Sequence, residues 1–157
     1  MPRRAGFLLA AVLLANVISP ALLAGIPGKK AVYRGGTLST IRPSAVGAVT
    51  TTDSRHFAFR YKRGELLIPY DRINSLEYGQ KSGRRFALAI TLSPLFLLSK
   101  KRKHYLTLSF FDAEGNQQAV VLELGKKIVR TTLAGLSARS GLKVEFEDEK
   151  AREALGR

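Results

Sequence analysis

The residues best suited to chemistry in this sequence are cations that border an apolar stretch. Arg84 and Arg85 precede thirteen uncharged residues, 86–98, and a run of four cations follows: Lys100, Lys101, Arg102 and Lys103. This arrangement predicts a membrane-docking segment, in which cations bind anionic headgroups while apolar side chains insert at the interface. The side chains expected to insert are Phe86, Leu95, Phe96 and Leu97.

A structural interpretation of the same segment also stays open. Thirteen residues are too few to span a bilayer as a helix. Phe86, Leu88 and Ile90 alternate with small residues, which fits strands that bend at Pro94 and belong to the core, with solvated basic ends. If the large side chains of this segment are buried together, the segment belongs to the core. If they project beside the basic run, the segment docks on a membrane.

Other cations allow a second anion-binding arrangement. Residues 60–63, with Lys81, either converge with the basic runs at one rim of the domain or remain separate solvated turns. Aromatic side chains interleave with cations at Phe57, Phe59 and Tyr61, as in proteins that stack single-stranded bases. They also alternate as core residues do, so nucleic acid is disfavoured as a partner.

No residue pattern predicts catalysis. The chain has no cysteine, which excludes thiol chemistry and disulfides, and its two histidines, His56 and His104, lack metal-binding spacing. No nucleophile motif or glycine-rich phosphate loop occurs. We interpret His104 as a solvent-exposed strand end. The expectation is a protein that is not an enzyme, with no cofactor and no metal.

Composition indicates one domain with a basic body. The 157 residues are 45% hydrophobic, enough for a single core, and carry a net charge of +14. Residues 25–144 hold 21 Lys and Arg against 7 acidic residues, whereas residues 145–157 are slightly acidic. A basic body of this kind suits a polyanionic partner, and anionic lipid is favoured because the densest cations adjoin apolar sequence.

Residues 1–24 are typical of an export signal. Arg3 and Arg4 precede an uncharged apolar run, and small residues follow near Ser19 and Ala21. The alternative is an uncleaved anchor of about 20 residues. We therefore expect an exported protein, periplasmic or secreted, or one tethered to the inner membrane.

Periodicity predicts short strands followed by one helix. The expected strands are 37–41, 45–52, 57–62, 65–70, 73–78, 105–111, 118–122 and 142–146, with 105–122 as a hairpin. Helical spacing starts near residue 124 and continues to about 140, and Gly141 suits the end of this helix. The domain is expected to cover residues 31–146, and residues 147–157 to form a charged tail.

About seven strands closed by a helix resemble the pleckstrin-homology-like split barrel, especially its bacterial and GRAM-type members. The likeness rests on residues 64–78, where an Ile-Pro-Tyr step leads into an Ile-x-x-Leu-Glu strand, and on the hairpin that runs into the helix with Leu133 and Leu136. The resemblance implies a mainly β fold of antiparallel strands that binds lipids or peptides and rarely catalyses. Besides membrane docking, it allows an interaction module that captures a peptide or partner strand at an open barrel edge.

Overall fold

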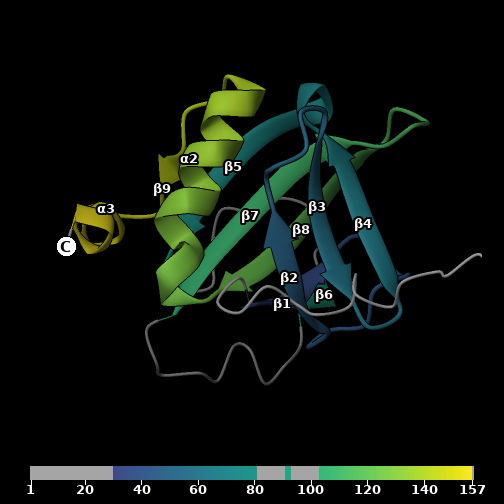
Figure 1. Ribbon diagram of the computed structural model, residues 1–157, viewed down its shortest axis with the longest axis horizontal. Coiled ribbons are helices and arrows are strands. Elements are labelled where there is room, and N and C mark those ends of the chain that lie inside the picture. The colour runs from purple at the N-terminus through teal and green to yellow at the C-terminus, as the bar shows by residue number, and fades with distance from the viewer. Residues whose placement is uncertain (1–29, 81–90, 93–102, 157) are drawn as a thin grey trace, which may run out of the picture.

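The computed structural model describes residues 30–80, 91–92 and 103–156, which form a curved sheet with helices on one side (Figure 1). The strands are β1 Lys30–Gly36, β2 Val46–Thr50, β3 His56–Tyr61, β4 Gly64–Pro69, β5 Ile73–Gly79, β6 Thr91–Leu92, β7 His104–Phe111, β8 Gln117–Leu124 and β9 Glu145–Phe146. The helical segments are η2 Tyr70–Arg72, η3 Lys126–Ile128, α2 Val129–Ser140 and α3 Glu149–Gly156. The prediction of a mainly β domain with a C-terminal helix is confirmed.

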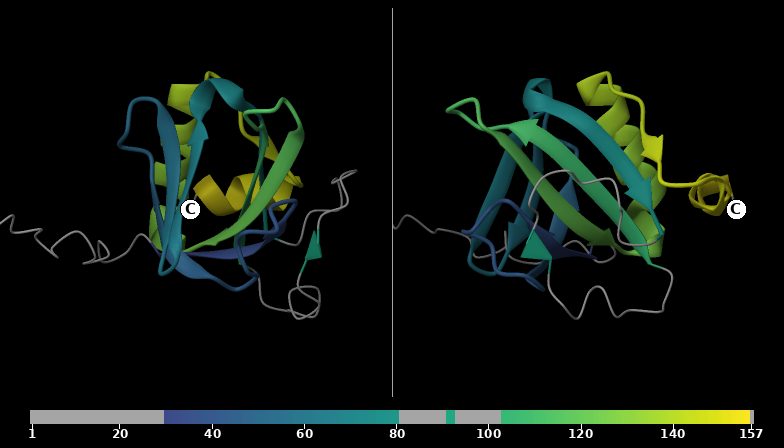
Figure 2. Two further views of the ribbon diagram at one scale, coloured as in Figure 1. Left: turned by 90° about the vertical axis from the view of Figure 1, so that its right-hand side faces the viewer. Right: turned by 180° about the vertical axis from the view of Figure 1, so that it is seen from behind.

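The strand order is β4-β3-β2-β1-β8-β7-β5-β9, and β6 pairs with β1. Neighbouring strands are antiparallel except β5 and β9, which pair in parallel. The sheet bends strongly, so that β2 to β4 stand on one side of the molecule and β5, β7 and β8 on the other, and β1 joins the two halves (Figure 2). Because β4 and β9 end the order and do not pair with each other among the described residues, the sheet is not a closed barrel.

Large apolar side chains on the concave face form the core. Alternation along each strand places these side chains inward, and the most completely buried ones are Tyr33, Phe57, Phe59, Ile68, Leu76, Tyr78, Leu106, Leu108 and Leu122. The predicted hairpin is confirmed by β7 and β8, whose turn is held by Asp112. Its Oδ1 atom accepts the backbone N–H groups of Glu114 and Asn116, at 3.1 and 2.7 Å.

The first strand differs from the prediction. Residues 37–41, predicted as a strand, are turns and bends, and the strand precedes them as β1. Gly36 lies so close to β8 that an added β-carbon would collide with the backbone carbonyl oxygen of Ala119. Glycine here marks a close approach of two strands and not a break between them.

Helix α2 closes the sheet beside η2. Its buried residues, Val129, Thr132, Leu133 and Leu136, follow the i, i+3, i+4 spacing of an amphipathic helix. The helix starts later than the predicted residue 124, because Leu124 still belongs to β8 and η3 intervenes. Its predicted end is confirmed: Gly141 caps it with a φ of 74°, a left-handed conformation that glycine adopts without strain.

The stretch predicted as a charged tail contains α3. Asp148 begins this helix, since its Oδ1 accepts the backbone N–H of Ala151 at 2.7 Å, and Ala151 is fully buried. The predicted signal or anchor segment, residues 1–24, lies outside the described residues. Among the described residues, no helix is long and apolar enough to cross a membrane.

Candidate functional site: the β5–β7 connection and the β4 edge

The predicted docking segment is the connection between β5 and β7. Of its ten predicted site residues only Lys103 is described; Arg84, Arg85, Phe86, Leu95, Phe96, Leu97, Lys100, Lys101 and Arg102 lie outside the described residues. The two ends of the connection are neighbours, because Gly79 at the end of β5 pairs with Tyr105 in β7. Its middle is tied to the sheet, since Thr91 and Leu92 pair with the end of β1.

Lys103 belongs to an ion-pair network on the sheet. Its Nζ lies 3.1 Å from a carboxylate oxygen of Glu123 in β8, and Arg34 in β1 lies 2.6 Å from the same carboxylate. All three side chains are at most about one-third exposed. Two cations therefore share one carboxylate, and Lys103 has less free charge for a headgroup than a fully solvated lysine.

His104 begins β7 at the root of the connection, as expected of a strand end, but it is partly buried and not fully solvent-exposed, so that part of the sequence interpretation was wrong. Its Nδ1 is 2.6 Å from the hydroxyl of Tyr78, and the two rings stack at a centroid separation of 6.0 Å. Burial, with the nearby charge of Lys126, lowers the pKa of His104, and burial raises the pKa of Tyr78 to about 12. Nδ1 of the neutral imidazole thus accepts a hydrogen bond from the tyrosine hydroxyl.

The second basic cluster is distant from Lys103 along the sheet. Residues 60–63 cover the end of β3 and its turn into β4, and β2, β1 and β8 separate β3 from β7 in the strand order. Arg60 forms an ion pair with Glu65 across the hairpin. Among the described residues, the structure therefore does not bring Arg60 and Lys103 to one anion site.

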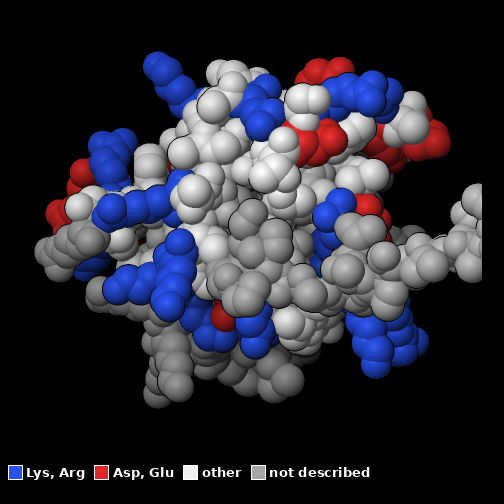
Figure 3. All heavy atoms as spheres, in the orientation of Figure 1, with Lys and Arg blue, Asp and Glu red and all other residues white. Residues whose placement is uncertain are grey.

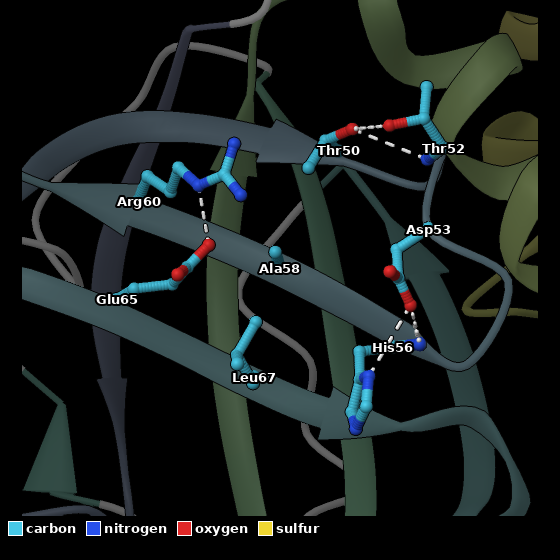
Figure 4. Close-up of a pocket in the computed structure, with 8 residues that line it drawn as sticks. All are labelled: Thr50, Thr52, Asp53, His56, Ala58, Arg60, Glu65 and Leu67. Atoms are coloured by element: carbon cyan, nitrogen blue, oxygen red, sulfur yellow. Dashed lines mark hydrogen bonds and ion pairs between the residues drawn. The ribbon is translucent and has the colours of Figure 1, made fainter. Parts of the chain in front are cut away.

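A shallow groove of about 380 Å³ crosses the outer face of β2 to β4 (Figure 4). Its lining comprises Thr50, Thr52, Asp53, His56, Ala58, Arg60, Glu65 and Leu67. Asp53 accepts the backbone N–H groups of Arg55 and His56, which lower the pKa of Asp53, and it lies 3.3 Å from Nδ1 of His56. These contacts close the β2–β3 turn, and Arg60 and Glu65 pair with each other, so each charged group already has a local partner.

The free edge of β4 is a feature that reasoning from the sequence located only generally, as an open barrel edge. In antiparallel pairs, alternate residues direct both backbone groups away from the neighbouring strand. The N–H of Tyr33 donates to the carbonyl of Ala45, so Tyr33 directs this group toward the β2 side. When the alternation is followed from β1 through β2 and β3 to β4, the backbone groups of Glu65, Leu67 and Pro69 point away from β3. Within the described part, no other backbone hydrogen bond occupies the outward groups of Glu65 and Leu67, whereas the carbonyl of Pro69 opens η2 and accepts the N–H of Arg72 there.

No group of three or more histidine or acidic side chains that could hold a metal ion occurs among residues 30–80, 91–92 and 103–156. The comparisons with protein-family models and with curated proteins found no match to this chain.

Proposed function

We propose that this chain is a non-enzymatic binding domain that docks on an anionic membrane surface through the connection between β5 and β7. The cations of this connection, Arg84, Arg85, Lys100, Lys101 and Arg102, bind the headgroups. Phe86, Leu95, Phe96 and Leu97 insert into the interface. Lys103 contributes less than these cations because Glu123 already binds it.

The observation that carries this proposal is the distribution of charge. All 12 acidic residues lie in the described part of the chain, together with 16 of the 26 Lys and Arg residues, so this part carries only +4 of the net charge of +14. On the face shown in Figure 3, basic and acidic side chains are interspersed. By contrast, residues 81–102 hold six further cations and no acidic residue.

The described ends of the connection support a surface role. Because Gly79 and Tyr105 pair, the chain leaves and re-enters the sheet at neighbouring points, and the pairing of Thr91 and Leu92 with β1 fixes a third point. We expect that attachment at three points lets the cations between them act on one membrane surface. This arrangement adds their attractions, each worth about 1 kcal/mol near an anionic surface.

We assign the fold to the pleckstrin-homology-like split barrels as part of the same proposal. Supporting it are the open, bent sheet, the β4–η2–β5 corner at the Ile-Pro-Tyr step, and α2 following the last long strand. Residues 1–24 would deliver the domain to an exported location or tether it to the inner membrane. Tethering would hold the basic connection near lipid.

Vesicle co-sedimentation of the full chain tests the headgroup contacts. The triple variant Lys100→Ala, Lys101→Ala, Arg102→Ala should lose on the order of 100-fold in partition onto vesicles that contain phosphatidylglycerol, since each cation contributes about 1 kcal/mol. The control Arg42→Ala, Arg55→Ala, Lys62→Ala removes the same charge from exposed turns outside the connection and should lose far less. Residues 1–24 are common to all variants and cannot produce the difference. Equal losses, or no dependence on anionic lipid, would contradict the proposal.

Fluorescence tests the insertion. The chain has no tryptophan, so Phe96→Trp introduces one reporter, and its emission should shift to the blue when anionic vesicles are added. Phe111→Trp is the control, because Phe111 is 43% exposed at the end of β7 and outside the connection. Vesicle binding without any shift at position 96 would show that headgroup contact occurs without insertion.

A second candidate function, capture of an extended partner strand, is favoured by the free edge of β4. Glu65 and Leu67 each direct an N–H and a carbonyl away from the sheet. An added strand would satisfy these groups by β-augmentation.

A further inference from the structure

We propose that the domain docks end-on, with the start of β1, the end of β8 and the start of α2 against the anionic membrane. In this orientation four cations, which we call the basic rim, bind lipid headgroups beside the β5–β7 connection: Lys30, Lys126, Lys127 and Arg130. The inference rests on the proposed membrane docking, to which it adds these four residues and the orientation of the domain.

Strand pairing brings the basic rim to one end of the sheet. Leu124, the last residue of β8, pairs with Ala31 at the start of β1 and with His104 at the start of β7. The N–H of Gly125 donates to the carbonyl of Lys30 at 3.0 Å, and η3 and α2 follow directly. The basic rim therefore lies beside the point where the connection re-enters the sheet.

The rim cations are available to an anionic partner. All four are exposed, and none forms an ion pair or a cation–π contact among the described residues. The acidic residue nearest to Lys126 along the chain, Glu123, already binds Arg34 and Lys103. Basic side chains gather where α2 begins, at the lower left of Figure 3.

Three of the rim cations lie where they do not stabilise the fold, at the start of α2. The first turn of this helix has no acidic residue, and Ile128, which precedes it, makes no side-chain capping hydrogen bond. Acidic side chains stabilise the positive end of a helix macrodipole, and basic ones destabilise it. The phosphate groups of a membrane would offset both the cations and the positive helix end.

Acidic residues lie on the sides that this orientation turns away from the membrane. The β7–β8 turn, with Asp112 and Glu114, is about 20 Å from the basic rim along β7. Residues 145–153 hold five acidic residues against two cations, and β5 separates β9 from β7 in the strand order. An anionic surface repels both groups, so the charge distribution favours the end-on orientation.

A tether at residues 1–24 would select the same orientation. From residue 24 to Lys30, where β1 begins, the chain can span only about 20 Å. An anchored domain therefore holds the start of β1, and the basic rim with it, near the membrane.

Vesicle partition of the full chain tests the rim cations. The rim variant Lys126→Gln, Lys127→Gln, Arg130→Gln should lower partition onto vesicles that contain phosphatidylglycerol about 10- to 100-fold, since each cation adds to the attraction. Its unfolding midpoint should stay unchanged or rise, because cations are removed from the positive end of α2.

The control variant is Arg55→Gln, Arg72→Gln, Arg139→Gln, which removes the same charge at the opposite end of the domain. Arg72 donates to the carbonyl of Asp112 in the β7–β8 turn, Arg139 in the last turn of α2 donates to the carbonyl of Thr52, and Arg55 lies beside η2. Partition should fall less than about threefold, because these positions are more than a screening length from the rim.

The outcomes separate this inference from the proposed docking. If the wild type does not bind anionic vesicles, both fail. If the triple variant of the connection loses partition and the rim variant does not, docking stands and the orientation is overturned, also where the rim variant binds a single-stranded oligonucleotide more weakly. A loss of partition with a lower unfolding midpoint would assign the rim cations to folding and would overturn their role in binding.

A fluorophore on α2 tests the orientation directly. The chain has no cysteine, so Thr131→Cys and Ala138→Cys each give one attachment site for the environment-sensitive dye NBD. Both residues are exposed, and seven residues place them on one face of the helix about 10 Å apart along its axis. On anionic vesicles the emission should shift to the blue at position 131 and not at 138. No shift at 131, or an equal shift at both, would overturn the end-on orientation.

Discussion

The hydroxyl of Tyr78 and the imidazole of His104 form a hydrogen bond that links β5 to β7 at the root of the proposed docking connection. Tyr78 is fully buried. His104→Phe keeps an aromatic ring but leaves this hydroxyl without its partner, which should lower the free energy of unfolding by about 1 to 3 kcal/mol at pH 7.5. Adding Tyr78→Phe should recover most of the loss in denaturant unfolding. A double variant as unstable as the single one would contradict this account.

The same pair predicts a pH dependence. Burial lowers the pKa of His104 in the folded chain. Near pH 6.5, His104 therefore binds a proton in the unfolded chain more readily than in the folded chain. Stability therefore falls as pH drops below about 6.5, until the lower folded pKa is passed. His104→Phe lacks this contribution, so the difference in unfolding free energy between wild type and variant should shrink between pH 7.5 and 5.5. A constant difference would show that His104 titrates normally.

The sequence shows the basic run that ends at Lys103, but it does not show that Lys103 forms an ion pair with Glu123. Glu123 is twenty residues away, and only the pairing of β7 with β8 and of β1 with β8 places Lys103 and Arg34 beside it. His104 was misjudged for the same reason. Its position after a basic run suggested solvent, whereas the pairing of β5 with β7 brings Tyr78 to it.

Helix α2 packs against the β2–β3 turn at Gly135. A β-carbon there would collide with the Thr51 side chain, whose own Cβ would lie 2.9 Å away. Alanine favours a helix over glycine by about 1 kcal/mol, but overpacking costs about 1 to 3 kcal/mol. We therefore expect Gly135→Ala to destabilise the wild type in thermal unfolding.

The collision can be removed to test its cause. In a Thr51→Gly background the three nearest atoms are absent, and Gly135→Ala should then stabilise by up to about 1 kcal/mol. Gly156→Ala, at the end of α3 with no atom within 4 Å, is the control for a change without contact. Destabilisation by Gly135→Ala in both backgrounds would rule out Thr51 as the cause.

Elements whose signals are local could be predicted, and those that depend on distant partners could not. The β7–β8 hairpin has its turn residues between two alternating runs, and Gly141 ends α2 by its own conformation. The strand expected over 142–146 is confirmed only at its end, where the two residues of β9 pair in parallel with β5. Helix α3 did have a local signal, Asp148 three residues before buried Ala151, which the acidic composition concealed.

At the scale of the whole molecule, salt should weaken membrane binding much more than it changes the stability of the fold. The described part carries only +4, whereas residues 81–102 carry six cations and no acidic residue. Raising NaCl from about 0.05 to 0.5 M shortens the screening length severalfold. It should reduce partition onto anionic vesicles at least tenfold while moving the unfolding midpoint by only a few degrees. Partition that resists salt would indicate apolar attachment without headgroup binding.

The sequence by itself determined the mainly β class, the hairpin, the final long helix and the concentration of positive charge between β5 and β7. These features depend on residue order, periodicity and formal charge, which need no knowledge of distant contacts. Only the tertiary structure decided that Lys103 shares Glu123 with Arg34, that Tyr78 meets His104, and that β4 keeps an open edge. Each depends on which strands become neighbours, and strand order follows from the packing of the whole core.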